Sequence, residues 1–228
     1  DHMQFLGNTV REIAGEKAGI IVPGVPVIYD GNDKDAAEVI AAKAKELGSP
    51  AYKVIQAGAK VLGNNKDGID FSLEDDYYGD TRFHIPFIAW YQVMNASLAL
   101  TTMEVLKDRI PVTMEQLQAG IANTRWQGRM ETILPGVIVD GAHNEDGVRR
   151  FVETAERFQK EYPLTLLFSA VNDKDYQDMI HTICSRIKFR KVVTTEVGGY
   201  REVPSAELAE IFCKEGCKDV GNSDNIEE

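Results

Sequence analysis

The spacing of apolar and polar residues in the first half of the chain predicts a mixture of helices and strands. Thr9 followed by Glu12 fits the capping box that begins a helix, and Gly19 can end that helix. Apolar residues three and four positions apart predict further helices at 35–47, 86–106 and 113–122. Short runs rich in β-forming residues predict strands at 25–29 and 52–55 and a β-hairpin over 69–85.

The pattern becomes a regular alternation of strands and helices after residue 130. Strands are expected at 137–139, 164–168 and 192–195, with helices following at 146–162, 175–187 and 205–215. Short loops between such elements predict an α/β fold whose parallel sheet is covered by helices on both faces. Periodicity breaks over 123–130, so we expect one domain over residues 1–125 and a second over 126–228.

Both ends of the sequence are unusual. The chain begins at Asp1 rather than at a methionine, and it closes on a strand-like run near 221–228 that has no helix after it. We therefore expect a piece of a longer protein.

Composition and charge restrict the class of function. The chain of 228 residues is 43% hydrophobic and has a formal net charge of −11, which argues against nucleic acid as a general partner. Local cations and backbone N–H groups can still hold a small anion. No apolar run is long enough for a membrane span and no signal peptide is evident, so we expect a cytoplasmic protein without a membrane partner. Cys213 and Cys217 lie one helical turn apart; a thiol pair or half a metal site is possible, but two small apolar residues are favoured.

The segment 137–144, Val-Ile-Val-Asp-Gly-Ala-His-Asn, carries the strongest chemical signal. It places Asp140 and His143 at the carboxyl end of an expected buried strand, the edge at which open α/β sheets bind ligands. Asp140 could orient a ribose, and His143 with the next helix N-terminus could meet phosphate or carboxylate oxygens. The alternative is a loop in which Asn144 only caps a helix.

Two further polar residues have a functional and a structural interpretation. Arg129 follows Gly128 at the expected boundary, and its planar guanidinium suits phosphate, although a solvated surface arginine explains it as well. Asn95 interrupts a nearly apolar helix, where asparagine is a poor helix former. An adenine edge or a backbone carbonyl would satisfy a buried carboxamide there equally well.

Lys17 lies on the apolar stripe of the first helix, where a lysine can reach water past its own stem. If it is desolvated instead, its neutral amine can react with carbon dioxide, and the carbamate is an oxygen ligand for Mg²⁺. His2 is a candidate second ligand near the same segment. The chain contains no G-x-x-x-x-G-K-[ST] phosphate loop, so a protein that uses ATP would need that loop from outside this chain.

Together these segments resemble the folylpolyglutamate synthase and dihydrofolate synthase family of the Mur ligase superfamily. Order and spacing agree over nearly the whole chain, and the matching stretches are Asp1-His2, Leu6-Gly7-Asn8-Thr9, Glu12-Ile13-Ala14-Gly15-Glu16-Lys17-Ala18-Gly19-Ile20-Ile21, Val25-Pro26-Val27, Gln92-Val93-Met94-Asn95-Ala96, Trp126-Gln127-Gly128-Arg129-Met130, Asp140-Gly141-Ala142-His143-Asn144 and Asp173-Lys174-Asp175. The family's usual Gly-x-His-Gln before the asparagine is replaced here by Ala89-Trp90-Tyr91-Gln92.

The resemblance implies the C-terminal part of a Mur-ligase-type ATPase domain followed by an incomplete, Rossmann-like glutamate-side domain. It implies an ATP-dependent ligase, a monomer at full length, that works in the cleft between the domains. Such a ligase adds L-glutamate to folate or dihydropteroate through an acyl phosphate. Lys17 then resembles the carbamylated lysine and His2 a Mg²⁺ ligand, while Asn95, Arg129 and Asp140 resemble ATP contacts and His143 a catalytic histidine. The phosphate loop lies upstream in the family, so we expect this chain alone to be inactive.

Two alternatives remain open from the sequence. A peptidoglycan Mur ligase would share the fold, but Glu16-Lys17-Ala18-Gly19-Ile20 argues against it. A non-catalytic nucleotide-binding module on the same fold predicts an unmodified Lys17 and no amide product.

Overall fold

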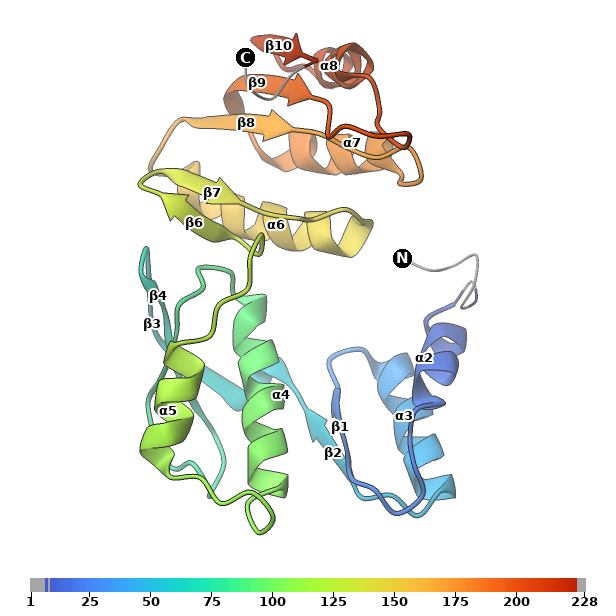
Figure 1. The fold of residues 1–228 in the computed structure, drawn as a ribbon, viewed down its shortest axis with the longest axis vertical. Coiled ribbons are helices and arrows are strands. Elements are labelled where there is room, and N and C mark those ends of the chain that lie inside the picture. Colours follow the sequence, from blue (N-terminus) through green and yellow to red (C-terminus); the bar gives the residue numbers. More distant parts are fainter. Residues whose placement is uncertain (1–6, 8, 225–228) are drawn as a thin grey trace. The chain divides into compact units, whose positions relative to one another are not determined.

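The computed structural model describes residues 7 and 9–224, and the chain divides into two compact units, residues 1–127 and 128–228 (Figure 1). Each unit has its own core and is described separately. The elements of the first unit are α2 (Val10–Ala18), β1 (Val27–Asp30), α3 (Lys34–Glu46), β2 (Ala51–Val54), the short 3-10 helix η1 (Gln56–Gly58), β3 (Ala59–Asn65), β4 (Gly68–Leu73), β5 (Phe83–Ile85), α4 (Tyr91–Val105) and α5 (Met114–Ala122).

The first helix of the unit begins as the sequence predicts. The Thr9 hydroxyl accepts a hydrogen bond from the Glu12 N–H at 3.2 Å, and the Glu12 carboxylate accepts one from the Thr9 N–H at 3.0 Å. This reciprocal pair satisfies two backbone donors that a helix N-terminus leaves without a partner. Asp33 caps α3 in a similar way, and α2 and α3 pack against each other.

Two separate sheets build the first unit, and α4 contacts strands of both. Strands β1 and β2 are parallel, whereas β3, β4 and β5 form an antiparallel sheet in that order. The predicted hairpin is confirmed by the pairing of Ile69 with Ile85 and of Phe71 with Phe83. The sequence pattern missed β3, whose glycine and asparagines interrupt the alternation and whose register shifts between Val61 and Gly63.

The helix predicted over 86–106 begins only at Tyr91. Phe87, Ile88 and Ala89 are buried, but they enter the core from an irregular segment that precedes the helix. The prediction was wrong here because an apolar run marks burial and does not by itself specify helical backbone. The core of this unit gathers Phe71 and Phe83 with Leu100 of α4.

A charged cluster on β4 and β5 makes the stability of this unit depend on pH. Asp70 accepts hydrogen bonds from Arg82 at 2.6 Å and from His84 Nδ1 at 3.0 Å, and the Arg82 guanidinium is the main reason that the pKa of Asp70 is lowered. A lowered carboxyl pKa stabilises the fold above the unfolded-state pKa of about 4, and this contribution is lost as the pH falls through the folded-state pKa.

We therefore expect Asp70→Asn to lower the free energy of unfolding near neutral pH by less than about 1 kcal/mol, since Arg82 is largely exposed and screened by water. The difference from the native chain should shrink as the pH falls to about 2.5. Urea titrations at a series of pH values would measure it. Asp67→Asn, a change at an exposed aspartate whose side chain has no described partner, is the control. A pH-independent loss would contradict the electrostatic explanation.

The second unit is an α/β structure whose helices pack on one face of a parallel sheet. Leu166 and Phe168 of the strand β8 contact both helix clusters, whereas Leu167, on the opposite face, is 59% exposed, so the expected cover of both faces was wrong for the described residues. Its elements are β6 (Glu131–Leu134), β7 (Val137–Val139), α6 (Glu145–Phe158), β8 (Leu164–Phe168), α7 (Tyr176–Arg186), β9 (Phe189–Thr195), α8 (Ser205–Lys214) and β10 (Val220–Ser223). Strands β8, β9 and β10 form a parallel sheet in the order β10-β9-β8, which confirms the predicted α/β class and most of the predicted alternation.

Two apolar clusters hold the parallel sheet and its helices together. One contains Val148 and Val152 of α6 packed with Ile183 of α7, and the other contains Leu208 and Phe212 of α8. Helix α7 contributes to both clusters, because Ile180 and Cys184 face the second one. The helices are thus fixed to the sheet by burial of apolar side chains, the main favourable term in folding.

Strand β7 does not belong to the parallel sheet, which corrects the sequence prediction. It pairs antiparallel with β6, and Val137 and Val139 are 42% and 40% exposed rather than buried. A run of only three apolar residues does not reveal which neighbour a strand pairs with, and the β6 partner was not predicted. Asp140 and His143 therefore follow a two-stranded hairpin and not a buried parallel strand.

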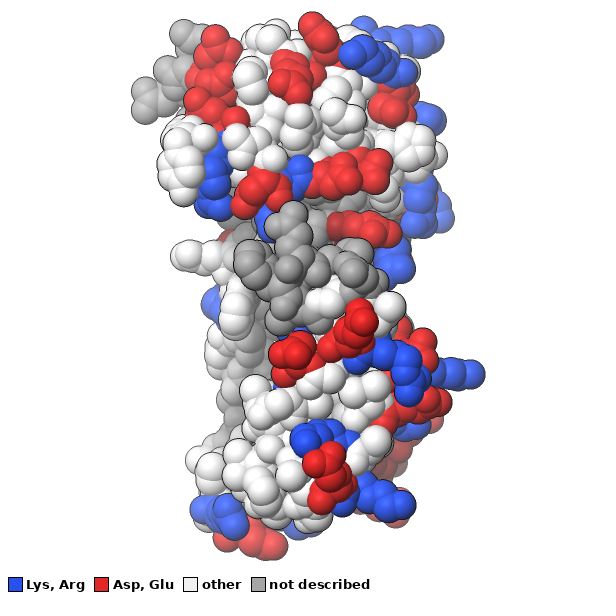
Figure 2. All heavy atoms as spheres, turned by 90° about the vertical axis from the view of Figure 1, so that its right-hand side faces the viewer, with Lys and Arg blue, Asp and Glu red and all other residues white. Residues whose placement is uncertain are grey.

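Charges of both signs are mixed on the face of the molecule shown in Figure 2. Between α2 and α3, Arg11 pairs with Asp35 at 2.8 Å and with Glu38 at 3.0 Å. Among the described residues, no helix is long and apolar enough to cross a membrane.

Candidate functional site

Two turns of the second unit, residues 128–130 and 140–142, are joined by backbone and side-chain hydrogen bonds; we call them the paired turns. The Gly141 N–H donates to the Gly128 carbonyl at 2.7 Å, and the Met130 N–H donates to Asp140 Oδ2 at 2.8 Å. These bonds lie at one end of the β6–β7 hairpin, whose strands connect the turns. Two segments that the sequence singled out separately are therefore one local structure.

The first of the paired turns has an uncommon backbone conformation. Gly128 has φ +65°, and Met130 has φ +48°, a left-handed value rarely adopted by a residue with a side chain. The Gly128 N–H donates to Glu131 Oε2 at 2.9 Å, and the Met130 side chain is only 3% exposed. Burial of Met130 and the bonds to Glu131 and Asp140 thus hold a conformation that would otherwise be costly. No sequence pattern pointed to the role of Glu131.

The Asp140 carboxylate connects the paired turns by hydrogen bonds. Besides the Met130 N–H, it accepts the Ala142 N–H on Oδ1 at 2.8 Å. Burial raises its pKa from the ordinary aspartate value, although both backbone N–H groups and the charges of Arg129 and His143 act in the opposite direction. Each carboxylate oxygen has a second lone pair, so a ligand hydroxyl could still bind. The structural role is evident, and the predicted ribose contact stays a prediction.

Arg129 lies between Gly128 and Met130, the two residues of the first turn with a left-handed backbone conformation. Its side chain is half-buried, and among the described residues its guanidinium makes no hydrogen bond or ion pair. The carboxylate of Asp140 is near enough to interact with it electrostatically. A guanidinium that is held by a fixed backbone and keeps its donors available is suited to bind a planar or tetrahedral anion.

His143 and Asn144 connect the second of the paired turns to α6. His143 is exposed, and its Nδ1 lies 2.8 Å from the Gly141 carbonyl oxygen, so Nδ1 carries the proton in that contact. Asn144 caps α6, because its side-chain oxygen accepts the Gly147 N–H at 2.7 Å, as the sequence predicts. Glu145 and Asp146 in the first turn of α6 are acidic, which stabilises the helix but weakens its attraction for an anion.

The buried amide of α4 is Gln92, not Asn95. Asn95 is exposed and donates from Nδ2 to Gln92 Oε1 at 2.8 Å, whereas Gln92 is 8% exposed. The assumption that Asn95 occupies a buried face was wrong, because the helix is apolar around most of its circumference and the sequence does not show which side meets water. Asn95 as a ligand contact stays a prediction, now for an exposed carboxamide.

Lys17 is exposed in the last turn of α2, which agrees with a lysine that reaches water; the burial on which the carbamylation hypothesis depends is not present among the described residues. The buried stripe of α2 runs through Ala14 and Ala18, and it passes beside Lys17. Desolvation by the described residues therefore provides no cause for carbamylation. His2 lies outside the described residues.

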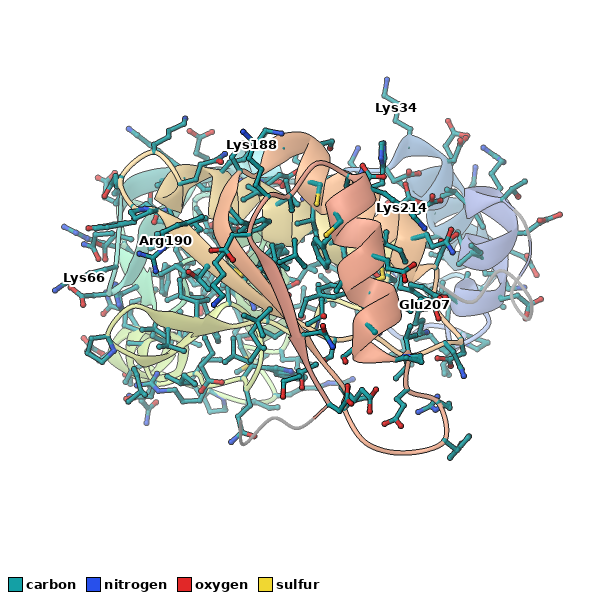
Figure 3. The ribbon with its side chains drawn as sticks, turned by 90° about the horizontal axis from the view of Figure 1, so that it is seen from above. Lys34, Lys66, Lys188, Arg190, Glu207 and Lys214 are labelled. Atoms are coloured by element: carbon teal, nitrogen blue, oxygen red, sulfur yellow. The ribbon has the colours of Figure 1, made fainter. Side chains whose placement is uncertain are left out.

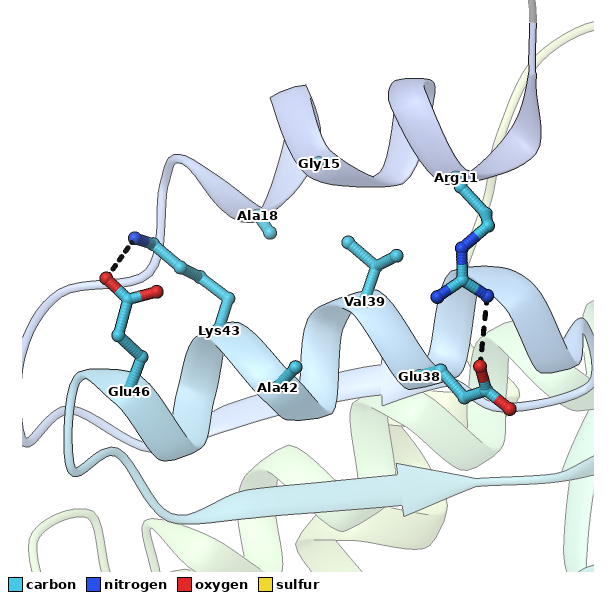
Figure 4. Close-up of a pocket in the computed structure, with 8 residues that line it drawn as sticks. All are labelled: Arg11, Gly15, Ala18, Glu38, Val39, Ala42, Lys43 and Glu46. Carbon is cyan, nitrogen blue, oxygen red and sulfur yellow. Dashed lines mark hydrogen bonds and ion pairs between the residues drawn. The ribbon is translucent and has the colours of Figure 1, made fainter.

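A shallow pocket between α2 and α3 has a cavity volume of about 320 Å³ and does not include Lys17 (Figure 4). Its lining residues are Arg11, Gly15, Ala18, Glu38, Val39, Ala42, Lys43 and Glu46. The charged residues at its two ends pair with one another, Arg11 with Glu38 and Lys43 with Glu46. The pocket therefore offers little uncompensated charge to a ligand.

The described residues do not form a metal site. Within 7 and 9–224, no three His, Cys, Asp or Glu side chains are grouped so that they could hold an ion. A protonated lysine amine is not a ligand for Mg²⁺, which prefers oxygen. The donor set on these residues does not fit Mg²⁺.

Comparisons with known proteins agree with the predicted family. Residues 128–228 match the model of the Mur ligase, glutamate ligase domain. The dihydrofolate synthase/folylpolyglutamate synthase of Bacillus subtilis is 36% identical over 201 residues, covering 83% of this chain and 46% of the relative. The folylpolyglutamate synthase of Lacticaseibacillus casei is 33% identical over 187 residues, covering 78% of this chain and 43% of the relative.

The solved folylpolyglutamate synthase of Thermotoga maritima has the same fold, with a TM-score of 0.78 at 26% identity over 95% of this chain and 51% of that chain. The present chain spans about half the length of these relatives. The paired turns lie at the start of the matched domain, where the sequence resemblance placed Gly128-Arg129 and the Asp140 segment. Residues 128–228 thus match the Mur ligase, glutamate ligase domain, and most of the chain is similar to one half of folylpolyglutamate and dihydrofolate synthases.

Proposed function

We propose that this chain is part of an ATP-dependent ligase that joins L-glutamate to folate or to dihydropteroate by an amide bond. The observation that carries the proposal is Arg129, whose available guanidinium is held beside Asp140 by the paired turns at the start of a glutamate ligase domain. The names of the relatives give the substrate class. A solved structure described as an FPGS-AMPPCP-folate complex, 28% identical with a TM-score of 0.76 over 98% of this chain, supports ATP and folate as ligands.

The proposed reaction passes through an acyl phosphate. The terminal phosphoryl group of ATP moves to a carboxylate oxygen of the folate, and ADP leaves. The glutamate amine then attacks the carbonyl carbon, and phosphate leaves as the amide forms. Charge develops on the phosphoryl oxygens during both steps, and a fixed arginine stabilises such charge.

Within this scheme the residues of the chain have different proposed roles. Arg129 would donate to phosphoryl oxygens, Asp140 would hold the turn that positions Arg129, and Asn95 would contact the nucleotide from the first unit. His143 would lie beside the phosphates or the incoming glutamate. Carbamylation of Lys17, Mg²⁺ binding and a ligand role for His2 stay predictions from the family resemblance.

We further propose that residues 1–125 are the C-terminal part of the ATP-binding domain and that residues 126–228 are the glutamate-side domain. A monomer without a nucleic-acid or membrane partner is proposed for the full length, and a cytoplasmic location remains an expectation.

The test is a ligase assay on this chain in the longer polypeptide that the family resemblance predicts. We expect ADP release that depends on both glutamate and a folate, with a product heavier by one glutamyl residue. Dihydropteroate should be tested beside folate to determine whether the enzyme accepts both. Turnover on a muramoyl substrate alone would indicate a peptidoglycan ligase. ADP binding without any amide product would indicate the non-catalytic module.

A further inference from the structure

Two cysteines that are distant in the sequence meet in the second unit. Cys184 belongs to α7 and Cys217 follows α8, and their sulfur atoms lie 3.7 Å apart. Cys184 is buried and Cys217 is half-buried, whereas Cys213, which the sequence had grouped with Cys217, is exposed and has no such partner among the described residues. The structure thus pairs Cys217 with Cys184 and not with its neighbour in the sequence.

Packing and backbone bonds hold both thiols in place. Gly216, with φ +91°, ends α8 in the left-handed conformation, and the Cys217 N–H donates to the Phe212 carbonyl at 3.1 Å. This turn brings Cys217 back over the cluster that contains Cys184, Leu208 and Phe212. In Figure 3, which shows the molecule from above, Glu207 and Lys214 are labelled on α8, and Lys188 is labelled just before β9.

We propose that Cys184 and Cys217 are a dithiol modification site that a peroxide converts into an intramolecular disulfide. The sulfur atoms need to approach from 3.7 Å to about 2.0 Å, a movement within reach of small changes in side-chain torsion and backbone position. Cys213 is excluded because it has no thiol beside it among the described residues.

The reaction is balanced with hydrogen peroxide as the oxidant. Cys217 loses its thiol proton, its thiolate attacks one peroxide oxygen, and the O–O bond breaks to give a sulfenic acid and hydroxide; the hydroxide takes up the released proton and leaves as the first water. The Cys184 sulfur then attacks the Cys217 sulfur, the S–O bond breaks, and the S–S bond forms as the second water leaves with the thiol proton. Two thiols are oxidised, and one peroxide is reduced to two waters.

The surroundings determine which thiol reacts first. Burial raises the pKa of Cys184 to about 12, and Cys217 and Glu215 act in the same direction while Lys188 opposes them. Cys217 is more accessible, so it is the thiol that meets the oxidant. Nearby, His181 pairs with Glu215 at 3.0 Å, which partly compensates that carboxylate when the histidine is protonated.

The disulfide would restrict the unfolded chain. It joins residues 33 positions apart, and it connects α7 to the segment that leads into β10. Closing such a loop lowers the entropy of the unfolded state, so oxidation should raise the melting midpoint of the second unit. A reductant should return the midpoint to its initial value.

Peptide mapping of the purified chain tests the proposal directly. Trypsin separates the three cysteines, since Cys184, Cys213 and Cys217 fall in peptides 175–186, 202–214 and 215–218. After exposure to a small excess of peroxide, we expect the intact mass to fall by about 2 Da and peptides 175–186 and 215–218 to be linked. The same treatment in strong denaturant should lose this selectivity, because the native fold brings the sulfurs together.

Cysteine variants distinguish the role of Cys184 and Cys217 from that of Cys213. Cys213→Ser should leave the intramolecular link and the rise in melting midpoint unchanged. Cys217→Ser, at a half-buried position, should abolish both, and Cys184→Ala provides the same check without adding a buried hydroxyl. Native circular dichroism would verify that each variant folds.

Three results would overturn the proposal. One is a native chain in which Cys217 gains about 32 Da as sulfinic acid while Cys184 stays a thiol. Another is a disulfide that contains Cys213 or joins two chains, seen as a dimer on non-reducing gels. The third is a link between Cys184 and Cys217 that forms as readily in denaturant as in the native state.

Discussion

Replacing Arg129 with alanine is expected to lower kcat/KM of the full-length ligase by about 100- to 1,000-fold, the usual cost of removing one charge-stabilising donor from an active site. The free energy of unfolding should change little, because the guanidinium makes no hydrogen bond or ion pair with the described residues. Steady-state ADP release and urea denaturation of the same preparations would measure the two quantities. Loss of activity without loss of stability would identify Arg129 as a ligand-binding side chain.

Two further substitutions sharpen this prediction. Arg129→Lys keeps the positive charge but loses the planar fork of donors, so it should recover only part of the activity. Arg157→Ala is the matched control, because Arg157 is an exposed arginine of α6 that also has no partner among the described residues. It should keep full activity. If Arg129→Ala retained the native kcat/KM, the proposed phosphate contact would be rejected.

Replacing Asp140 with alanine is expected to lower both stability and activity. The substitution leaves the Met130 and Ala142 N–H groups without their acceptor, which should cost about 1–3 kcal/mol of the free energy of unfolding. It also releases the left-handed turn that carries Arg129, so kcat/KM should fall by about 100-fold or more because a displaced catalytic group loses effectiveness. Denaturant titration of this chain and the ligase assay at full length would measure these effects.

The pH dependence distinguishes the buried carboxyl group from an ordinary surface aspartate. Because burial raises the folded-state pKa of Asp140, its stabilising contribution is fully present below the unfolded-state pKa of about 4 and decreases as the pH rises through the folded-state pKa. The difference in stability between the native chain and Asp140→Ala should therefore be largest in acid. Asp219→Ala, at an exposed aspartate of the same unit, should change neither stability nor activity. Native activity in Asp140→Ala would show that the paired turns do not position Arg129.

The sequence by itself determined the local structure where short-range rules dominate. Thr9 begins α2 with a capping box, and Asn144 caps α6. Both caps depend on residues three positions apart, so neighbouring side chains alone determine them. The alternation of strands and helices after residue 163 also follows from apolar periodicity, and it gave the parallel sheet. The spacing of Gly128-Arg129 and Asp140-Gly141 is itself enough to carry the resemblance to the family.

Only the tertiary structure decided which residues are buried and which segments meet. It placed β7 against β6, buried Gln92 in place of Asn95, and left Lys17 exposed. It also joined Gly128 to Gly141 and Cys184 to Cys217, contacts between residues separated by 13 or more positions. Periodicity shows that one face of a helix or strand is apolar. The element that packs on that face is often distant in the sequence, so only the folded structure shows which one it is.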